Sequence, residues 1–304
     1  MSFQGNLNDY PLWTALITPM LSNGDVDYAS LENLLKAQHD AGNGILLLGS
    51  TGEALNLRED ERRTILSHSL SYLKKNNLNS PIMVGVGGAE FHTTKEWVQY
   101  LNTLDIHAYL LVTPLYAKPG TQGQRKWFEE LMNLSERPCM LYNVPSRTGI
   151  KMSFDAVSAL KDHPKLWAIK EASGSTEDFA KYVAAAPKAR VYSGDDALLN
   201  DFSVIGAKGL VSVASNVWPA QTHAYTKACL SGELAKNQTD LNMWKEATNS
   251  LFVASNPIPA KYLMAKHNEI VTANLRAPLD IEDMCNENKV IESHQNVTTW
   301  FQNL

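Results

Sequence analysis

The runs PCMLYNVP (residues 138–145) and LWAIKEAS (residues 166–173) decide the fold, because both are short, apolar and rich in β-forming residues and both end in turn-forming residues. Runs of this kind recur along the chain, and most are followed by an amphipathic segment long enough for a helix, such as residues 28–42 and 58–77. The eight runs are residues 13–19, 44–51, 82–88, 107–114, 138–145, 166–173, 190–196 and 209–216.

Strands that alternate with helices pair in parallel through right-handed crossovers, and eight such units close into a barrel more readily than they form an open sheet. The sequence therefore predicts an α/β protein, a (β/α)8 TIM barrel over residues 1–225 with a C-terminal helical appendage over residues 226–304. In the appendage, helices are expected around residues 234–251, 258–267 and 282–301. A doubly wound sheet is the alternative, but Gly85, Gly87 and Gly88 lack the spacing of its glycine fingerprint.

Composition restricts the class of protein. The chain has 304 residues, of which 44% are hydrophobic and 19% charged, so a globular protein is expected. A net charge of -5 argues against a nucleic-acid partner, and the lack of an apolar run of 18 residues argues against a membrane span. The first basic residue is Lys36, which does not fit a secretory signal, and the three cysteines are too scattered for a disulfide framework. We therefore expect a cytoplasmic protein with free thiols.

Lys170 is the first candidate for catalysis, because active sites of such barrels lie at the C-terminal ends of the strands. Alternation places Lys170 with Ala168 on the face opposite Trp167 and Ile169, and this face is predicted to be the barrel interior. A lysine removed from water loses its proton more readily, and its neutral amine attacks a carbonyl to give a Schiff base. A surface or salt-bridged lysine is the alternative.

Other candidates follow the ends of the predicted strands. The turn GSTGE (residues 49–53) presents backbone N–H groups and two hydroxyls to a small anion such as a carboxylate, or else simply caps the next helix. Tyr142 and Tyr116 are either catalytic or ordinary packing residues. Arg147, in a turn after the fifth strand, has a planar guanidinium suited to a substrate carboxylate, unless it lies on a solvated surface.

Metal-dependent chemistry would need His, Asp or Glu ligands that converge at the strand ends. The histidines are scattered over predicted helices and loops, and His107 opens its strand at the opposite end. Asp195 and Asp196 are adjacent, so their side chains point to opposite sides of a strand, and the start of a helix explains them. The sequence therefore predicts no metal and no cofactor.

The turn GSTGE (49–53), the segment YNVP (142–145) and the strand IKEAS (169–173) together resemble the dihydrodipicolinate synthase and N-acetylneuraminate lyase family of Schiff-base-forming barrels. The motifs occur in the family's order, and the resemblance extends from Trp13 to the segment NPIPAK (256–261). It implies a lyase in which Lys170 condenses with the keto group of pyruvate and Tyr142 transfers protons. It also implies that Thr51 links Tyr142 to Tyr116, and that a neighbouring subunit supplies Tyr116 in a homo-oligomer, either a dimer or a tetramer.

The resemblance also implies how the substrates bind. Ser50 and Thr51 are expected to hold the carboxylate of pyruvate, with Gly194 and Val211 in the wall of the site. Arg147, within NVPSRTG, is typical of the synthase branch, where the second substrate is L-aspartate 4-semialdehyde and its carboxylate meets this arginine. The expected product is 4-hydroxy-tetrahydrodipicolinate, the committed precursor of diaminopimelate and lysine.

Two alternatives to this function stay open. Within the family, the chain could be a pyruvate-dependent aldolase or lyase acting on sialic or 2-keto-3-deoxy sugar acids. From another class, it could be a catalytically silent barrel that binds a keto acid.

The resemblance predicts a weak or absent response to L-lysine. Leu115 stands where many synthases carry a tyrosine that lines the lysine feedback site, and the other matching positions also lack the usual hydrogen-bonding residues. Those positions are Ala54, Glu59, Arg62, Glu90 and Thr94.

Overall fold

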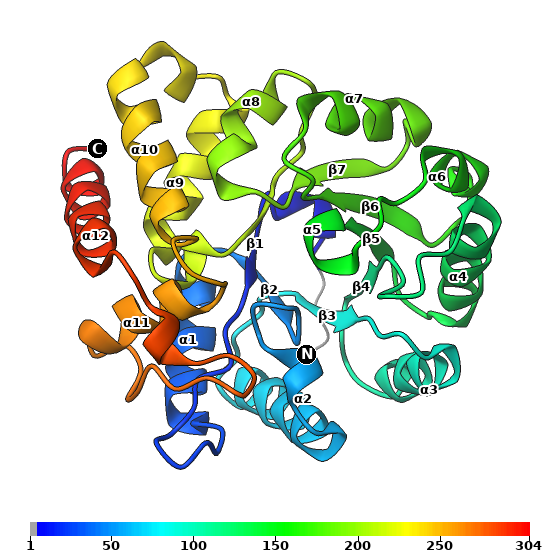
Figure 1. Ribbon diagram of the computed structural model, residues 1–304, viewed down its shortest axis with the longest axis horizontal. Helices are drawn as coiled ribbons and strands as arrows, with labels where there is room; N and C mark the ends of the chain where they lie inside the picture. Colours follow the sequence, from blue (N-terminus) through cyan, green and yellow to red (C-terminus); the bar gives the residue numbers. More distant parts are fainter. Residues whose placement is uncertain (1–4) are drawn as a thin grey trace. The chain divides into compact units, whose positions relative to one another are not determined.

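The computed structural model describes residues 5–304, and its eight strands close into a parallel barrel in chain order, with helices between them (Figure 1). Each strand overlaps one of the eight predicted runs, so the predicted (β/α)8 TIM barrel is confirmed. The strands are β1 Leu12–Ala15, β2 Gly44–Leu47, β3 Ile82–Val86, β4 Ala108–Val112, β5 Cys139–Asn143, β6 Leu166–Glu171, β7 Arg190–Ser193 and β8 Leu210–Ser212.

The chain divides into two compact units. The first unit combines both ends of the chain, up to Pro81 and from Ser212 onward, and the second unit is the continuous segment Ile82–Val211. The expected boundary at residue 225, between a barrel and an appendage, stays a prediction.

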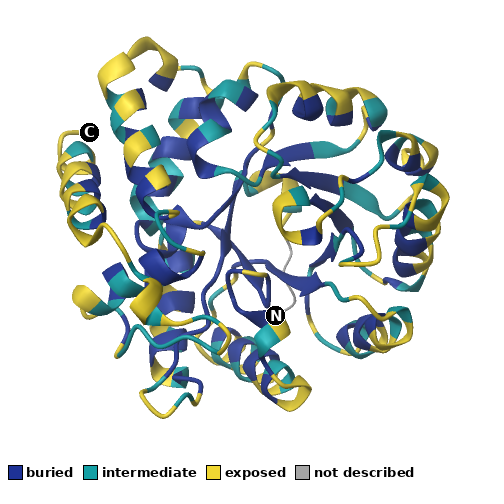
Figure 2. Cartoon of the chain, in the orientation of Figure 1, coloured by how far each residue is buried: buried dark blue, intermediate teal, exposed yellow. Residues whose placement is uncertain are grey.

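In the second unit, amphipathic helices cover the outer side of the strands, and Figure 2 shows their buried residues on the sides that face the strands. Phe128 of α4 is fully buried, and Phe179 of α7 stacks on Phe202 of α8 with ring centroids 4.3 Å apart. The helices are α3 Phe91–Asn102, α4 Thr121–Leu134, α5 Pro145–Thr148, α6 Phe154–Leu160, α7 Thr176–Ala185 and α8 Leu199–Ser203, with the 3-10 turn η3 Asp196–Leu198 before α8.

In the first unit, the three helices expected at the C-terminal end are present, and α10 packs along α12. Trp244 of α10 joins this packing, since its ring stacks on Tyr225 of α9 and meets Trp300 of α12 edge-on. The helices are α1 Tyr28–Asp40, α2 Glu59–Lys75, α9 Pro219–Leu230, α10 Gln238–Ser250, α11 Ile258–Lys266 and α12 Glu287–Gln302. The 3-10 turns are η1 Leu7–Asp9, η2 Ala54–Asn56, η4 Ala214–Asn216, η5 Leu234–Lys236 and η6 Ile281–Asp283.

The side chain of Asn216 joins the two ends of the chain within the first unit. Its Oδ1 accepts a hydrogen bond from the Ile17 N–H at 2.9 Å, and its Nδ2 donates to the Ala15 carbonyl, also at 2.9 Å. Because Asn216 is buried, these bonds satisfy backbone groups that water cannot reach.

Arg147 lies directly after β5, as expected from the sequence, and the turn that carries it is helical. It belongs to the four-residue helix α5, which begins with Pro145 and ends at Gly149, where φ is +72°. Proline presets the backbone angle of a first helical residue, and glycine adopts the left-handed conformation of a helix end without strain. The pair therefore forms a helical turn too short for a sequence periodicity to reveal.

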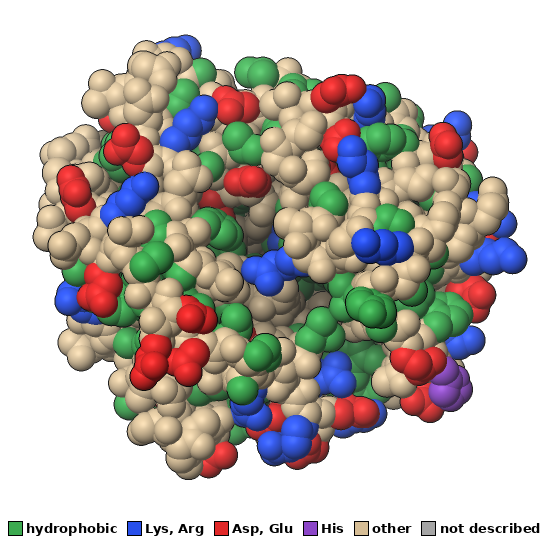
Figure 3. Space-filling model, viewed as in Figure 1, with side chains coloured by type: hydrophobic (Ala, Val, Ile, Leu, Met, Phe, Trp, Pro, Cys, Tyr) green, Lys and Arg blue, Asp and Glu red, His purple; other side chains and the backbone are tan. Residues whose placement is uncertain are grey.

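The surface carries no broad patch of one charge on the face shown in Figure 3, where acidic and basic side chains are interspersed. Between residues 5 and 304, none of the helices has the length and apolar character needed to cross a membrane.

Candidate active site

Lys170 and Tyr142 lie side by side on adjacent strands of the second unit. Their Cα atoms are partners in the register of β5 and β6, so both side chains occupy the same face of the sheet. The Lys170 Nζ lies 4.3 Å from the centroid of the Tyr142 ring, and the two residues are 5% and 6% exposed. The amine therefore lies over the face of the phenol ring, in an environment from which most water is removed.

The electrostatic surroundings of Lys170 favour its neutral form. Burial lowers the pKa of Lys170 to about 7. The Asp196 carboxylate in η3 opposes this shift, and the Arg147 guanidinium in α5 adds to it. Near neutral pH, a large fraction of the amine is therefore free to attack a carbonyl carbon.

Gly194 leaves the space that the Lys170 side chain occupies. A Cβ atom added at Gly194 would lie 2.8 Å from the Lys170 Cε and 2.7 Å from the Ala172 Cβ, both too close for real atoms. Val211, the other expected wall residue, is fully buried in β8. Glycine at position 194 therefore avoids a close contact with both Ala172 and the Lys170 side chain.

Tyr116 differs from the other candidates in its exposure. It is 90% exposed within this chain, and its φ of +64° lies in the left-handed region, which is uncommon for an aromatic residue. The segment after β4 thus presents the tyrosine ring outward instead of packing it.

In the first unit, the turn 49–53 is held in place by buried polar contacts. Thr51 is buried and its Oγ1 accepts a hydrogen bond from Asn256 Nδ2 at 2.9 Å, whereas Ser50 is exposed. Thr18 Oγ1 donates to the Gly52 carbonyl at 2.7 Å, and a Cβ at Gly52 would approach the Leu16 carbonyl oxygen to 2.9 Å. The turn has little freedom to move.

Glu53 anchors the end of this turn. It has a left-handed backbone, with φ of +56°, and its buried carboxylate binds the buried Lys261 Nζ at 2.5 Å and accepts from the Arg276 N–H at 2.7 Å. Burial lowers the pKa of Lys261, although Glu53 opposes this shift. A residue on α11 therefore fixes a turn some two hundred positions earlier in the chain.

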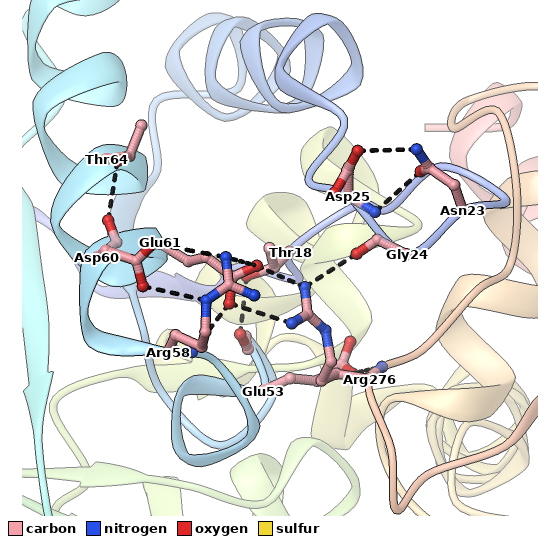
Figure 4. Close-up of polar contacts among 11 residues, drawn as sticks. Thr18, Asn23, Gly24, Asp25, Glu53, Arg58, Asp60, Glu61, Thr64 and Arg276 are labelled. Carbon is pink, nitrogen blue, oxygen red and sulfur yellow. Dashed lines mark hydrogen bonds and ion pairs between the residues drawn. The ribbon is translucent and has the colours of Figure 1, made fainter.

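Arg276 extends this network toward α2, as Figure 4 shows. Its guanidinium binds both carboxylate oxygens of Glu61, at 2.8 and 3.1 Å, and donates to the Gly24 carbonyl at 2.9 Å. Burial alone would raise the pKa of Glu61, but the hydrogen bonds from Arg276 and the Arg58 backbone lower it below its ordinary value. The bidentate geometry fixes the direction of the arginine as well as its charge.

The candidate residues therefore form two groups, and the contacts of each group are described within its own unit. Lys170, Tyr142 and Gly194 are brought together in the second unit, and Ser50 and Thr51 share the anchored turn of the first unit. Over the described range, no three His, Cys, Asp or Glu side chains are grouped so that they could hold a metal ion.

The model of the Dihydrodipicolinate synthetase family matches residues 10–294 of this chain. The chain belongs to this family. Its relatives include proteins named 4-hydroxy-tetrahydrodipicolinate synthase from Francisella philomiragia and from Wolbachia pipientis. The first is 46% identical over 293 residues, which are 96% of this chain and 97% of the relative, and the second is 44% identical over 290 residues, 95% and 96%.

Solved structures of the Dihydrodipicolinate synthetase family have the same fold. The 4-hydroxy-tetrahydrodipicolinate synthase of Methylacidiphilum fumariolicum aligns with a TM-score of 0.89 at 28% identity, covering 97% of each chain. A chloride-inhibited dihydrodipicolinate synthase from Acinetobacter baumannii, complexed with pyruvate, aligns with a TM-score of 0.87 at 30% identity, covering 95% of this chain and 99% of its own.

Sequence reasoning missed three residues that support the site. The pattern assigns Asp196 only to the start of a helix; it does begin η3, but its charge also acts on Lys170. Asn256 and Lys261 lie in the segment NPIPAK, which carries the family resemblance without indicating a role for either residue. The signal that could have indicated Asn256 and Lys261 was the presence of an amide and a lysine in an otherwise apolar, proline-rich segment.

We predict that Lys170→Met stabilises the protein at neutral pH while removing the nucleophile. The pKa of Lys170 is about 7 when folded and about 10.4 when unfolded, so the unfolded chain binds more protons between these values and wild-type stability rises with pH across that window. Methionine has no ionisable group, so the variant avoids the free-energy cost of deprotonating Lys170 on folding. The free energy of unfolding should increase by about 2–4 kcal/mol at pH 7, with the gap closing toward pH 10.

Chemical denaturation of both proteins from pH 6 to 10 measures this gap. A variant less stable than wild type at pH 7, or a gap that does not change with pH, would contradict the assignment of a neutral buried amine.

Proposed function

We propose that this protein condenses pyruvate with L-aspartate 4-semialdehyde to 4-hydroxy-tetrahydrodipicolinate, in diaminopimelate and lysine biosynthesis, with Lys170 as the nucleophile. The observation that carries the proposal is the buried Lys170 amine, with a pKa of about 7, 4.3 Å from the ring of Tyr142. Membership of the Dihydrodipicolinate synthetase family supports the same reaction.

The reaction balances without a cofactor. The neutral Lys170 amine adds to the keto carbon of pyruvate, and loss of water gives an imine. Loss of a methyl proton converts the imine to an enamine, whose carbon attacks the aldehyde of the second substrate. The amino group of that substrate then attacks the imine carbon and displaces Lys170. We assign to Tyr142, whose ring lies beside the Lys170 amine, the transfer of protons to and from nitrogen and oxygen.

The other roles are assigned from the family resemblance. We assign Ser50 and Thr51 to the pyruvate carboxylate, and Thr51 and Tyr116 to the same proton transfer as Tyr142. We assign Gly194 and Val211 to the wall of the site.

We propose a homo-oligomer, dimer or tetramer, in the cytoplasm, in which a neighbouring subunit supplies Tyr116. The 90% exposure of Tyr116 in the single chain supports this arrangement.

Borohydride reduction in the presence of pyruvate tests the proposal directly. We expect mass spectrometry of the digested protein to find a lactyl-sized adduct on Lys170 alone, because reduction makes the imine permanent. The wild-type protein should also turn over pyruvate with L-aspartate 4-semialdehyde. Lack of the adduct would favour a silent keto-acid-binding barrel, and cleavage of a sialic or 2-keto-3-deoxy sugar acid instead would move the protein to the lyase branch.

Arg147→Ala should separate the two substrates. The guanidinium is assigned to the carboxylate of L-aspartate 4-semialdehyde, so we expect the KM for this substrate to rise by about tenfold to a hundredfold, as for a lost charge-assisted hydrogen bond. Pyruvate should still form the adduct on Lys170. Arg125→Ala, which removes an arginine that pairs with Glu129 and Gln122 of its own helix α4, is the matched control. Equal losses for both substrates would refute this role of Arg147.

L-lysine should inhibit turnover weakly or not at all. Of the positions that match the feedback site, Glu90 is already committed, since its carboxylate accepts hydrogen bonds from the His92 and Thr93 N–H groups and caps α3. The Thr93 hydroxyl also donates to this carboxylate, and together with the two N–H groups it lowers the pKa of Glu90 to about 2. Initial rates with and without lysine measure the response, and a steep loss of turnover below millimolar lysine would prove the prediction wrong.

A further inference from the structure

Asn143 and Glu171 each follow a residue of the reactive pair by one position. Tyr142 precedes Asn143 on β5 and Lys170 precedes Glu171 on β6, and the two strands are paired in register at both levels. Since side chains alternate across a sheet, Asn143 and Glu171 meet on the face opposite the reactive pair. Both are fully buried, and Asn143 Nδ2 donates to Glu171 Oε2 at 2.7 Å.

The remaining oxygen of each side chain binds a backbone N–H. Asn143 Oδ1 accepts from the Met152 N–H and Glu171 Oε1 accepts from the Ser173 N–H, both at 2.8 Å. These groups form one chain of hydrogen bonds, and the Ser173 side chain adds a further hydrogen bond to the Glu171 carboxylate. This chain spans β5, β6 and the two segments that leave them.

Asn143 also anchors the segment that carries Arg147. Met152 ends this segment, and its carbonyl accepts a hydrogen bond from the Tyr182 hydroxyl on α7. Its N–H is held by Asn143, so both backbone groups of Met152 are tied to buried side chains. The position of Arg147 relative to Lys170 therefore depends on Asn143.

The surroundings of Glu171 make its partners important. Burial raises the pKa of Glu171, and the hydrogen bonds from Ser173 and Asn143 oppose that shift, while Asp178 reinforces it. Asp178 is itself paired with Lys151 at 2.5 Å. A buried carboxylate that loses one donor is destabilised strongly, and the strand that carries it shifts to find another partner.

We propose that Asn143 and Glu171 are a positioning pair that holds Lys170 beside Tyr142 and holds the Arg147 segment against the same site. The catalytic role of this pair rests on the proposed function. The pair touches no substrate. It acts by fixing the two strands and one connecting segment from the outer face of the sheet.

Counting donors and acceptors yields a sharp test. In Asn143→Asp, two carboxylates face each other with no donor between them. In Glu171→Gln, the new amide N–H2 faces a donor, either Asn143 Nδ2 or the Ser173 N–H. In the double variant N143D/E171Q, the carboxylate introduced at position 143 accepts from Met152 and from the glutamine amide, whose oxygen accepts from Ser173. All three hydrogen bonds are restored, the one between positions 143 and 171 runs in the reverse direction, and the net charge is unchanged.

The experiment compares wild type, both single variants and the double variant by two readouts at Lys170. One is the initial rate of pyruvate trapping by borohydride at pH 7.5. The other is the pH midpoint of Lys170 acetylation by trace acetic anhydride, followed by mass spectrometry, which needs no pyruvate. Thermal unfolding reports whether each variant is folded. Glu177→Gln and Asn242→Asp, which make the same chemical changes at exposed positions, are the matched controls.

We expect each single variant to lose trapping rate by about tenfold, as for one lost hydrogen bond to a charged group. The pKa of Lys170 is lowered by burial and by Arg147 and is raised by Asp196. If Arg147 loses its position, the acetylation midpoint should therefore move up by about half a pH unit. The double variant should return to within about twofold of wild type.

Three results would overturn the positioning pair. These are folded single variants with unchanged Lys170 reactivity, a folded double variant as impaired as the singles, and a double variant that does not fold. Failure of wild type to trap pyruvate would instead refute the proposed function, and the acetylation midpoints would still decide the role of the pair.

Discussion

The removal of the Lys170 amine from water constrains much of the second unit. A buried ammonium is costly, so the group sits near neutrality, with the single charge of Asp196 opposing the shift and the face of Tyr142 beside the nitrogen. Beside the side chain, Gly194 carries only a hydrogen, where a Cβ atom would crowd both Lys170 and Ala172. The reactivity of Lys170 thus follows from the burial that keeps its amine largely neutral.

Within each unit, buried charged groups near the candidate residues make their hydrogen bonds inside that unit. In the second unit, Glu171 is bound by Asn143 and the Ser173 backbone. In the first unit, Glu53 is bound by Lys261 and the Arg276 backbone. Such pairs add little net stability compared with apolar packing, but they specify one arrangement of the segments that they join. Precise placement of reactive groups is the benefit expected of them.

The fold was predictable from local pattern, whereas the support of the site was not. Apolar runs such as residues 166–173 identified all eight strands, and alternation within that run predicted a buried Lys170, although Ile169 and Glu171 on the opposite face are buried too. The contact between Glu53 and Lys261 joins residues 208 positions apart, and no periodicity encodes a partner at such a distance. The helix α5 was missed because four residues are too few to show a helical period. The role of Asp196 depends on its closeness to Lys170, which only the folded chain reveals.

The division of the chain has a consequence for biosynthesis. The first unit needs residues from both termini, and Asn216 supplies hydrogen bonds to the backbone of Ala15 and Ile17. During translation, the opening strands leave the ribosome long before these partners exist. The segment 82–211 is continuous and is released whole while the opening strands still lack them. The unit that begins first is thus completed last, because its opening strand obtains these hydrogen bonds only from residues beyond position 211.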